Sequence, residues 1–421
     1  MTTTLNTSCC IAGGGPAGMM LGFLLARMGV RVIVLEKHSD FLRDFRGDTI
    51  HPSTLELMYE LGLLEEFLKR PHQKVTELSA VIGGETVRLA DFTHLPTHCK
   101  MLALMPQWDF LNFLVEQGRG YETFEVRMQS EVTGLIQEAG RVAGFQVKTP
   151  NGPLEVRASL NVGADGRSSI VRKTAGLQVM DLGAPMDVLW LRLSKKDTDP
   201  EQTLGHVQPG RLFIMIARDE YWQCGYIIAK GEFDEVRNQG IEKCRDEIVK
   251  LAPFVGDRVA ELRDWNDVSL LTVKVDRLQR WSRPGLLCIG DAAHAMSPIG
   301  GVGINLAIQD AVATANILGP KLVAGNLSDH DLEAVQHRRQ FPTYATQKIQ
   351  VLIQNRVIRR LLTREAPVEV PWPMKLAKEW PSLRRIPARM IGLGFRPEHI
   401  HTPDIRPASL PKVSSQSRPA I

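Results

Sequence analysis

The first 36 residues alternate between apolar and polar stretches in a way that predicts a β-α-β unit. Ser8–Ala12 is a short apolar run, and Pro16–Gly29 has the composition of an apolar helix that stops at its glycine. Val30–Leu35 then has the pattern of a buried strand. We therefore expect two parallel strands joined by a buried helix at the start of the chain.

An irregular stretch, 37–52, separates this unit from the next predicted helix. Ser53 and Glu56 have the spacing of a capping box, in which each side chain bonds to the backbone of the other. This spacing predicts a helix that begins at Ser53 and runs to about Gly62.

Strand-like patterns dominate two later blocks, at about 76–92 and about 187–230. The second block holds three runs rich in β-branched and aromatic residues, namely Asp187–Leu193, Arg211–Ile216 and Tyr221–Ile228. Between the blocks the chain returns to helix and strand. We predict an α/β (α+β) fold in which a parallel-sheet domain is interrupted by a mainly antiparallel β domain, with a ligand cleft between them.

The C-terminal third is predicted to be helical. Ala307–Leu318 is an apolar helix, and apolar residues recur at helical spacing from Tyr344 to Leu362 with Arg356, Arg359 and Arg360 between them. The first interpretation is a helix packed on the body with a solvated basic face, and the alternative is a helix that contacts a membrane surface or a partner. Residues 402–421, rich in proline and serine, are predicted to be a disordered tail.

Composition narrows the class of protein. The chain has 421 residues, 43% of them hydrophobic and 23% charged, with a net charge of +4. Such a mild charge argues against a nucleic-acid binder. The apolar stretch 17–26 is about half of the roughly 20 residues that a membrane span needs, and six cysteines without a CxxC pair argue for buried, reduced thiols. We expect a cytoplasmic protein without a transmembrane segment or signal peptide.

The first chemical signal is a glycine-rich turn between the predicted strand and helix. Gly13, Gly15 and Gly18 fit G-x-G-x-x-G, and Glu36 follows the next strand. The first glycine permits a tight turn, the second lets backbone approach a pyrophosphate, and the third lets helix pack on strand. Glu36 would accept hydrogen bonds from an adenosine ribose and would repel a 2′-phosphate, which favours FAD or NAD over NADP. The cofactor-binding residues predicted from this unit are Gly13, Gly15, Pro16, Ala17, Gly18, Glu36 and Lys37.

Two later segments decide between FAD and NAD through a resemblance. Residues 288–298, CIGDAAHAMSP, with the glycine-rich stretch 300–305 behind them, resemble the GD motif of the flavin-dependent aromatic hydroxylases. Residues 161–169, NVGADGRSS, resemble the DG motif of the same family. Three motifs in family order identify the chain as similar to the single-component (group A) FAD-dependent aromatic monooxygenases, of the p-hydroxybenzoate and ubiquinone-biosynthesis type. The resemblance covers about 1–345.

The chemistry of the GD segment agrees with that resemblance. Asp291 follows an apolar strand and would accept a hydrogen bond from a ribityl hydroxyl, although a lone Asp there would equally serve as a helix cap. Glycines let backbone pass beneath a flat ring and offer it N–H donors. The family places such amides near the flavin pyrimidine, and the matching positions are Gly303, Ile304 and Asn305.

The DG segment and two other positions complete the predicted cofactor site. The resemblance implies that Asp165 serves FAD, and that Arg167 and Arg172 contact the pyrophosphate of a transiently docked NAD(P)H, unless they are surface arginines. Arg46 lies where the family places an arginine near flavin and reductant. Gln107 matches a position that contacts the ribityl–phosphate region, where many relatives carry arginine.

The resemblance also implies a reaction. NAD(P)H reduces the flavin, O2 gives a C4a-hydroperoxide, and this oxidant hydroxylates a phenolic or quinone-like ring. The catalytic residues are left unknown, and the expected substrate contacts are Arg211, Tyr221, Gln223 and Pro298. Alternatives are a hydroxylase or epoxidase of a larger apolar polyketide or quinone precursor, and a non-catalytic flavin-binding sensor. A homodimer is left open.

Other candidate sites are weaker. His51 and His294 are interpreted as local hydrogen-bonding residues, and His399 with His401 has no third ligand at a useful spacing, so no metal site is predicted. The expected organisation is an FAD-binding domain of 1–75, 98–180 and 271–345. A β-sheet substrate domain comprises 76–97 and 181–270, and C-terminal helices comprise 346–401.

Overall fold

The parallel strands lie in an eight-stranded sheet, which runs β19-β20-β11-β1-β2-β8 with β10 and β9 branching from β11. The computed structural model describes residues 3–42, 49–200, 204–218, 220–363 and 369–406. Strands β20, β11, β1, β2 and β8 pair in parallel. Their bounds, with those of the flanking strands, are β1 Thr3–Ala12, β2 Val32–Leu35, β8 Phe124–Arg127, β9 Glu131–Glu138, β10 Arg141–Thr149, β11 Gly152–Gly163, β19 Ser282–Arg283 and β20 Leu286–Cys288.

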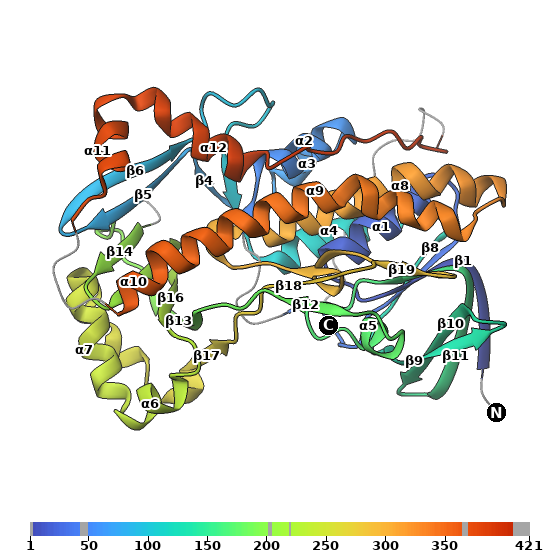
Figure 1. Ribbon diagram of the computed structural model, residues 1–421, viewed down its shortest axis with the longest axis horizontal. Coiled ribbons are helices and arrows are strands. Elements are labelled where there is room, and N and C mark those ends of the chain that lie inside the picture. The colour runs from blue at the N-terminus through green and yellow to red at the C-terminus, as the bar shows by residue number, and fades with distance from the viewer. Residues whose placement is uncertain (1–2, 43–48, 201–203, 219, 364–368, 407–421) are drawn as a thin grey trace.

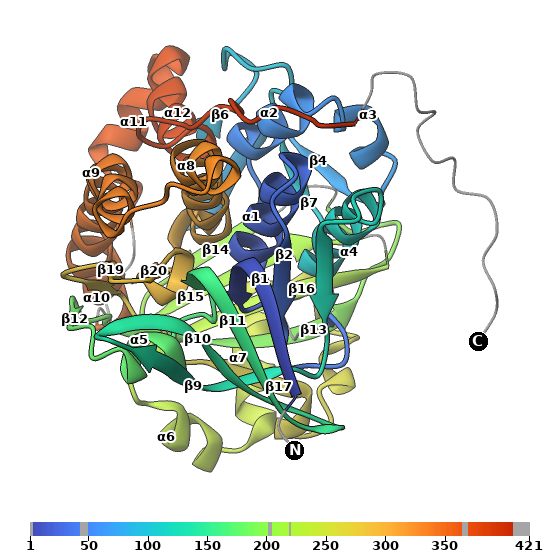
Figure 2. The ribbon, with the colours of Figure 1, turned by 90° about the vertical axis from the view of Figure 1, so that its right-hand side faces the viewer.

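The predicted β-α-β unit is confirmed as β1, α1 (Pro16–Arg27) and β2. Helix α1 is apolar on nearly every side because it is covered on nearly every side. It lies against the sheet and packs against α4 (Gln107–Gly118) and α8 (Gly303–Ala324), as Figure 2 shows. This arrangement fixes the start of α1 at the sheet edge.

The predicted capping box is wrong. Helix α2 covers Pro52–Glu60, its N-cap is His51, and Ser53 lies inside the first turn. Proline is favoured at the first helical position because its fixed φ suits a helix and its missing N–H needs no partner there. The helix therefore begins before the serine that the pattern selected.

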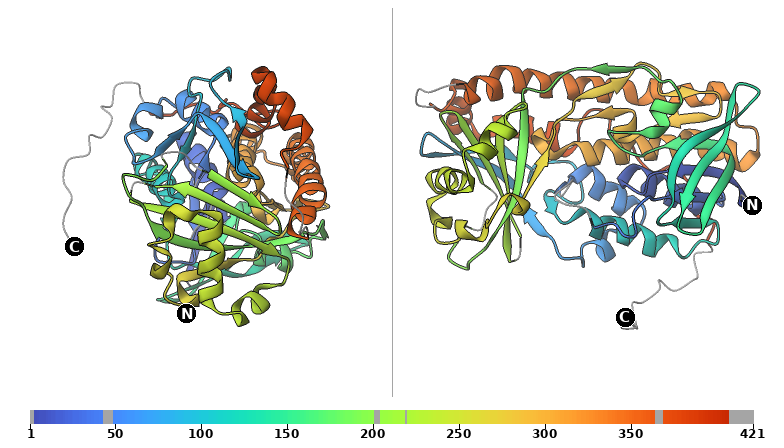
Figure 3. Two further views of the ribbon diagram at one scale, coloured as in Figure 1. Left: turned by 90° about the vertical axis from the view of Figure 1, so that its left-hand side faces the viewer. Right: turned by 90° about the horizontal axis from the view of Figure 1, so that it is seen from below.

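The two strand-rich blocks of sequence form one seven-stranded sheet in the order β17-β13-β16-β15-β14-β5-β6. All neighbours are antiparallel except β14 and β5. Helices α6 (Phe233–Asn238) and α7 (Ile241–Leu251) lie at this end of the molecule, and α7 packs on one face of the sheet (Figure 3). The predicted combination of a parallel sheet and an antiparallel β unit is thus confirmed. The strands are β5 Glu77–Ile82, β6 Glu85–Asp91, β13 Met186–Ser194, β14 Leu204–Gln208, β15 Arg211–Ala217, β16 Tyr221–Ala229 and β17 Val268–Leu271.

A long helix joins the two sheets. Helix α9 (Asp329–Ile353) continues through a π-helical turn (Gln354–Ile358) into α10 (Arg359–Leu362), and Figure 1 shows it running from beside α8 to the antiparallel sheet. Ile358 and Leu361 are buried, whereas Arg356, Arg359 and Arg360 are exposed. The end of the helix is therefore packed on the body with a basic outer side.

The remaining elements cover the edges of the two sheets. Helices α11 (Trp372–Glu379) and α12 (Arg385–Gly392) pack against β6. The others are α3 Leu64–Phe67, α5 Ile170–Thr174, β3 Thr49–Ile50, β4 Gln73–Val75, β7 Leu102–Leu104, β12 Val179–Asp181, β18 Asp276–Leu278, β21 His294–Ala295, and the 3-10 turns Pro253–Val255, Val259–Glu261, Trp265–Asp267, Gly290–Ala292, Ile299–Gly301 and Pro381–Arg384.

The C-terminal segment is held to the body further than predicted. The Arg27 guanidinium donates to the Thr402 carbonyl at 2.6 Å, and the Tyr121 hydroxyl donates to Asp404 at 2.9 Å. Residues 402–406 therefore belong to the folded body, and the rest of the predicted tail, 407–421, lies outside the described residues.

Two further expectations concern the whole chain. No helix in the described ranges is long and apolar enough to cross a membrane. All six cysteines are free thiols, and five of them are buried as predicted, while Cys99 is half-buried. Burial raises the pKa of the Cys244 thiol to about 11, against the weaker opposing effect of Arg245.

Candidate cofactor and substrate site

Four parallel strands end in one row at one edge of the eight-stranded sheet. Ala12 is paired with Leu35 on one side and with Gly163 on the other, and Gly163 is paired with Cys288. These are the last residues of β1, β2, β11 and β20. The three motif segments therefore leave the sheet side by side, at the edge where open parallel sheets bind ligands.

The glycine-rich turn is shaped by two close backbone contacts. Gly13 has a φ of +106°, and a Cβ there would lie 2.3 Å from the carbonyl oxygen of Ala164. A Cβ at Gly18 would lie 2.0 Å from the Gly13 oxygen, so neither position accepts a side chain. Nothing lies within 4 Å of a Cβ built at Gly15. The turn is thus closed toward the protein and open beside Pro16, where the first N–H groups of α1 begin.

Glu36 is oriented by backbone donors at the end of β2. One carboxylate oxygen accepts from the Gly14 amide at 2.9 Å, and the other accepts from the His38 amide at 3.1 Å. The residue is buried, whereas the adjacent Lys37 is exposed. Glu36 therefore presents a carboxylate that is held in place at the end of β2, and the side chain of Lys37 is exposed to solvent.

Asp165 at the end of β11 has an unpaired oxygen. Its Oδ2 accepts from the Val171 amide at 3.1 Å, but its buried Oδ1 has no hydrogen-bond partner among the described residues. Burial raises the pKa of this carboxyl above its ordinary value, although hydrogen bonds from Ser169 and the backbone oppose the shift. A buried oxygen without a donor costs stability, and a donor on a ligand would remove that cost.

The DG and GD motifs meet through an ion pair. The Arg167 guanidinium donates to Asp291 at 3.2 Å, and both side chains are partly exposed. Gly290 has a φ of +59°, and a Cβ there would lie 3.1 Å from that of Ala17 and 3.2 Å from that of Ala307. The GD turn is therefore packed between α1 and α8, with Asp291 facing the motif edge.

Arg172 does not lie on the surface. Its guanidinium donates to both oxygens of Asp276 at 3.1 and 3.0 Å, and to the backbone carbonyls of Arg167 and Ala292. Only 8% of the residue is exposed. The sequence prediction that Arg172 docks NAD(P)H is not supported by this placement, because its donors are used within the protein.

The glycine-rich loop precedes the N-terminus of α8. Gly300 and Gly301 have φ values of +77° and +62°, conformations that favour glycine. Gly303 is the first residue of the 22-residue helix α8, and Ile304 is buried behind it. The first N–H groups of a helix have no acceptor within the helix, so those at the start of α8 meet the requirement for the predicted ring donors.

The side chain of Asn305 has a structural role, separate from the backbone amide that the resemblance implies for a flavin ring. Its oxygen accepts from the His51 amide at 2.9 Å and from the Thr54 hydroxyl at 2.7 Å, while its Nδ2 donates to the Thr49 carbonyl at 2.9 Å. The side chain therefore ties the start of α8 to the start of α2. Only its backbone amide is left for a ring.

His51, which the sequence analysis interpreted as a hydrogen-bonding residue, is buried. Its Nδ1 lies 2.7 Å from the carbonyl oxygen of Ile391, and its buried Nε2 has no hydrogen-bond partner among the described residues. Burial lowers the pKa of His51 to about 4, against the opposing effect of the Ile391 carbonyl. The imidazole is neutral at pH 7, with a proton on Nδ1 and a bare Nε2 toward the Gly301 side.

A buried charge network supports the GD turn from behind, and His294 is its only member that the sequence analysis singled out. Asp310 accepts from the Gly290 amide at 3.1 Å, from Arg339 at 3.0 Å, and lies 2.5 Å from the His294 ring nitrogen. Burial opposes ionisation of Asp310, but His294 and Arg339 hold its pKa below the ordinary value. Glu398 also pairs with Arg339, at 3.1 Å. His294 is thus a local hydrogen-bonding residue, as predicted.

The predicted substrate residues lie on two different faces of the antiparallel sheet. Arg211 pairs with Glu247 of α7, so it lies on the helix-covered face. Tyr221 and Gln223 alternate with Trp222, which is packed in the core under α7, so they lie on the opposite face. The prediction that Arg211 contacts the substrate is therefore not supported, because the alternation of side chains along the strand turns Arg211 away from the cofactor domain.

The last predicted positions lie at the border of the site. Gln107 is the first residue of α4 and is half-buried. Pro298 immediately precedes the 3-10 turn Ile299–Gly301 in the glycine-rich loop. Arg46 lies outside the described residues, as does the rest of 43–48.

These residues fit FAD. Three features lie along one sheet edge: the open space at Gly15, the carboxylate of Glu36 and the unpaired oxygen of Asp165. Asp291 and the N-terminus of α8 lie at the same edge. A donor set for pyrophosphate, acceptors for ribose and ribityl hydroxyls, and donors for a ring thus occur in one line. No group of three or more side chains suited to a metal ion occurs in the part of the chain that the structure describes.

Comparison with known proteins agrees with this geometry. The profile of a family described as FAD binding domain matches residues 6–348. The chain is 34% identical over 351 residues to 6-methylpretetramide 4-monooxygenase of Streptomyces rimosus, which covers 82% of this chain and 83% of that protein. It is 26% identical to 2,4-dichlorophenol 6-monooxygenase of Delftia acidovorans, covering 73% of this chain and 56% of that protein. The solved structure of an anhydrotetracycline hydroxylase from Streptomyces rimosus superposes with a TM-score of 0.70 at 26% identity, over 92% of this chain and 76% of that one.

Proposed function

Because the chain belongs to the FAD binding domain family and is an FAD-dependent monooxygenase, we propose that it hydroxylates a phenolic or quinone-like aromatic compound, using NAD(P)H and O2. Bound FAD supplies the transfer of two electrons from NAD(P)H and the activation of O2. The protein's own residues bind and orient the cofactor and the substrate, and they exclude water from the reaction.

The cofactor is assigned along the sheet edge from its adenosine to its ring. The amides at the start of α1, beside Gly15, hold the pyrophosphate, and Glu36 accepts from the adenosine ribose. Asp165 and Asp291 accept from hydroxyl groups of the cofactor. The free amides at the start of α8, from Gly303 to Asn305, stabilise negative charge that develops on the reduced ring.

Arg167 is the proposed docking residue for NAD(P)H. It is partly exposed, and its guanidinium is planar and matches phosphate oxygens. Its contact with Asp291 holds the guanidinium at the cofactor edge. If the Asp291 carboxylate turned toward a ribityl hydroxyl of FAD, the Arg167 guanidinium would become available to the pyrophosphate of NAD(P)H.

The substrate is assigned to the space between the antiparallel sheet and the glycine-rich loop. Tyr221 and Gln223 face this side of the sheet, and Pro298 lies in the loop. Gln223 is buried, and its side-chain oxygen accepts from Arg218 at 3.0 Å. This contact orients the Gln223 amide, whose nitrogen can donate to a phenolic or carbonyl oxygen.

The observation that carries the proposal is the single row of strand ends that brings Glu36, Asp165 and Asp291 to one edge. The test is the visible absorbance of purified protein loaded with FAD, followed by NADPH or NADH oxidation in air with anhydrotetracycline or 2,4-dichlorophenol. Stimulated oxidation with a product heavier by one oxygen supports a monooxygenase. Bound flavin without stimulation by any aromatic compound would instead favour a flavin-binding sensor.

A further inference from the structure

The segment that leads into the glycine-rich loop is buried but lies outside any helix or strand. Strand β21 ends at Ala295 and the 3-10 turn begins at Ile299, so 296–298 belong to neither. Ser297 is only 1% exposed, and its backbone N–H and C=O groups therefore need partners within the protein. The next residue is Pro298, one of the predicted substrate contacts.

Gln350 of α9 supplies these partners. Its Oε1 accepts from the Ser297 amide at 3.2 Å, and its Nε2 donates to the carbonyl oxygens of Ser297 at 3.0 Å and of Ile299 at 2.9 Å. The side-chain amide thus exchanges two hydrogen bonds with Ser297, as a residue of a neighbouring antiparallel strand would. One side chain therefore fixes the backbone both before and after Pro298.

Gln354, one turn further along the same helix, holds the Ser297 side chain. Its Nε2 donates to the hydroxyl oxygen of Ser297 at 2.8 Å, and that oxygen also accepts from the Ile299 amide at 3.3 Å. Gln354 is fully buried, and Gln350 is 3% exposed. Displacing the segment would leave buried polar groups without partners, which costs free energy, so both glutamines resist such a displacement.

The far side of the loop is fastened as well. The Gly301 amide donates to the Pro298 carbonyl at 3.0 Å, and Nδ2 of Asn305 donates to the Gly301 carbonyl at 3.4 Å. Helix α8, which carries the proposed ring donors, begins two residues after Gly301. The place of Pro298 relative to these donors is therefore set by α9 on one side and by α8 on the other.

The contacts of Gln350 demand an amide at the end of a long side chain. They use one acceptor and two donors, and a side-chain amide offers both kinds of group. Methionine has a similar length and volume but no N–H donor. Gln350→Met therefore removes the hydrogen bonds to Ser297 and Ile299 and keeps the packing.

We propose that Gln350, assisted by Gln354, is a positioning residue of the reaction, which holds Pro298 beside the substrate while the amides at the start of α8 face the flavin ring. The inference rests on the proposed monooxygenase function and adds residues of α9 to its machinery. Where Pro298 is displaced, NAD(P)H, O2 and a proton would be converted to NAD(P)+ and hydrogen peroxide, and the substrate would be left unchanged.

The test measures the ratio of hydroxylated product to NAD(P)H consumed by the FAD-loaded enzyme, with anhydrotetracycline or 2,4-dichlorophenol, whichever stimulates the oxidation. Gln350→Met should lower this ratio about threefold or more, because a small misplacement of the reacting groups is costly. Hydrogen peroxide should account for the difference. The visible bands of bound flavin should shift too, because the donors that face the ring move with the loop.

Gln347→Met is the matched control. Gln347 is one turn before Gln350 on α9 and is equally buried, but its Nε2 donates to the carbonyl oxygens of Asp276 at 2.8 Å and of Ala295 at 3.1 Å, ahead of Ser297. In urea unfolding it should lose about as much stability as Gln350→Met, since both lose buried hydrogen bonds. Its product ratio and flavin spectrum should nevertheless match wild type.

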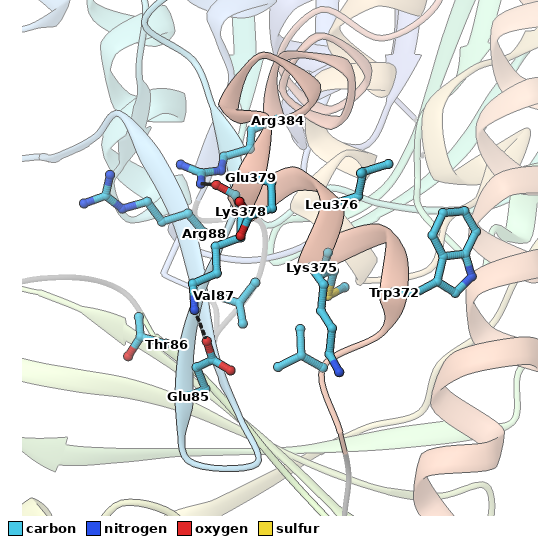
Figure 4. A pocket seen from close by; sticks show the side chains of 12 residues that line it. Glu85, Thr86, Val87, Arg88, Trp372, Lys375, Leu376, Lys378, Glu379 and Arg384 are labelled. Atoms are coloured by element: carbon cyan, nitrogen blue, oxygen red, sulfur yellow. Dashed lines mark hydrogen bonds and ion pairs between the residues drawn. The ribbon is translucent and has the colours of Figure 1, made fainter.

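A surface control comes from the groove between β6 and α11. Figure 4 shows Lys378 reaching across this groove to Glu85. Lys378→Met removes an exposed ion pair, which contributes little to stability, so this variant should match wild type in all three measurements. Gln354→Met is a second variant of the positioning pair in case Gln350→Met folds poorly, and it should change the product ratio in the same direction.

The outcomes separate positioning from a purely structural role. If the product ratio falls equally in Gln350→Met and Gln347→Met, or in neither, the proposal is overturned and the monooxygenase function stands. If neither aromatic compound stimulates NAD(P)H oxidation by the wild-type protein, the proposed function fails. The flavin spectrum then decides the role of Gln350: a shift in Gln350→Met but not in Gln347→Met supports it, and equal spectra overturn it.

Discussion

At the scale of single residues, the cofactor edge depends on groups that the protein's own backbone and side chains hold in place. Glu36 receives two backbone amides, Asp165 keeps one oxygen unpaired, and Arg167 is held by Asp291. Preorganised acceptors of this kind lose little freedom when a cofactor binds. Changes at these residues should therefore appear first in FAD affinity, and only afterwards in turnover.

Glu36→Gln should weaken FAD binding about tenfold or more, because the new amide group points a donor at backbone donors and cannot accept two ribose hydrogen bonds. The measurement is titration of the FAD-free protein with FAD, followed by quenching of flavin fluorescence. Glu131→Gln, at an exposed position of β9, is the control and should bind FAD as wild type does. Equal affinity in both variants would contradict the assignment of Glu36.

His51 should make the protein sensitive to acid. Its pKa in the folded state is about 4, below the value of about 6.5 expected in the unfolded chain, so the unfolded state binds a proton first. Stability should therefore be lost as pH falls from about 6.5 toward 4, by about 2 to 3 kcal/mol at pH 4.5. This loss of stability is measured by urea unfolding of the wild-type protein and the His51→Asn variant at pH 7 and at pH 4.5. The difference in stability between the two proteins should shrink at pH 4.5, and a constant difference would contradict it.

At the scale of elements, the order of strands and helices was predictable, whereas the start of α2 and the side-chain partners were not. The β-α-β unit and the strand runs follow from apolar periodicity, because covered surfaces must be apolar. Periodicity does not say which face of a strand meets which domain, so Arg211 was assigned to the wrong one. The Asp310 network was missed because its members lie far apart in sequence and meet only in the fold.

Arg172 shows how an element-level contact changes a prediction about function. It ties α5 to β18 through Asp276, so Arg172→Met should leave a buried carboxylate unpaired and lower the free energy of unfolding by about 3 to 5 kcal/mol. Urea unfolding measures this loss. The KM for NAD(P)H should change less than twofold in the folded fraction, whereas Arg167→Ala should raise it about tenfold. A KM for NAD(P)H that rises in Arg172→Met and stays unchanged in Arg167→Ala would instead identify Arg172 as the docking residue.

At the scale of the whole molecule, the C-terminal segment supports the cofactor edge from a distance. Glu398 pairs with Arg338 and Arg339, and Arg339 pairs with Asp310, which accepts from the Gly290 amide beside Asp291. Three buried charges thus connect the end of the chain to the GD turn. This connection explains why polar residues are tolerated so deep between α8 and α9.

Glu398→Gln should therefore destabilise the protein by a few kcal/mol, about 2 to 4, because the buried Arg339 keeps its charge and loses a carboxylate. Thermal unfolding of the FAD-loaded and FAD-free proteins measures the effect, and bound FAD should recover part of the loss. Glu333→Gln is the control, because Glu333 lies on α9 with a side chain that is 45% exposed. A variant as stable as the control would contradict a supporting role for this network.

The central claim is that the sheet edge and the face of the antiparallel sheet that carries Tyr221 and Gln223 together form a monooxygenase site. The most direct measurement supplies the FAD-loaded protein with NADPH or NADH, anhydrotetracycline or 2,4-dichlorophenol, and dioxygen labelled with oxygen-18. Mass spectrometry should find one labelled oxygen atom in a hydroxylated product. A product that carries no label, or NAD(P)H oxidation that yields only hydrogen peroxide with every aromatic compound, would contradict the account.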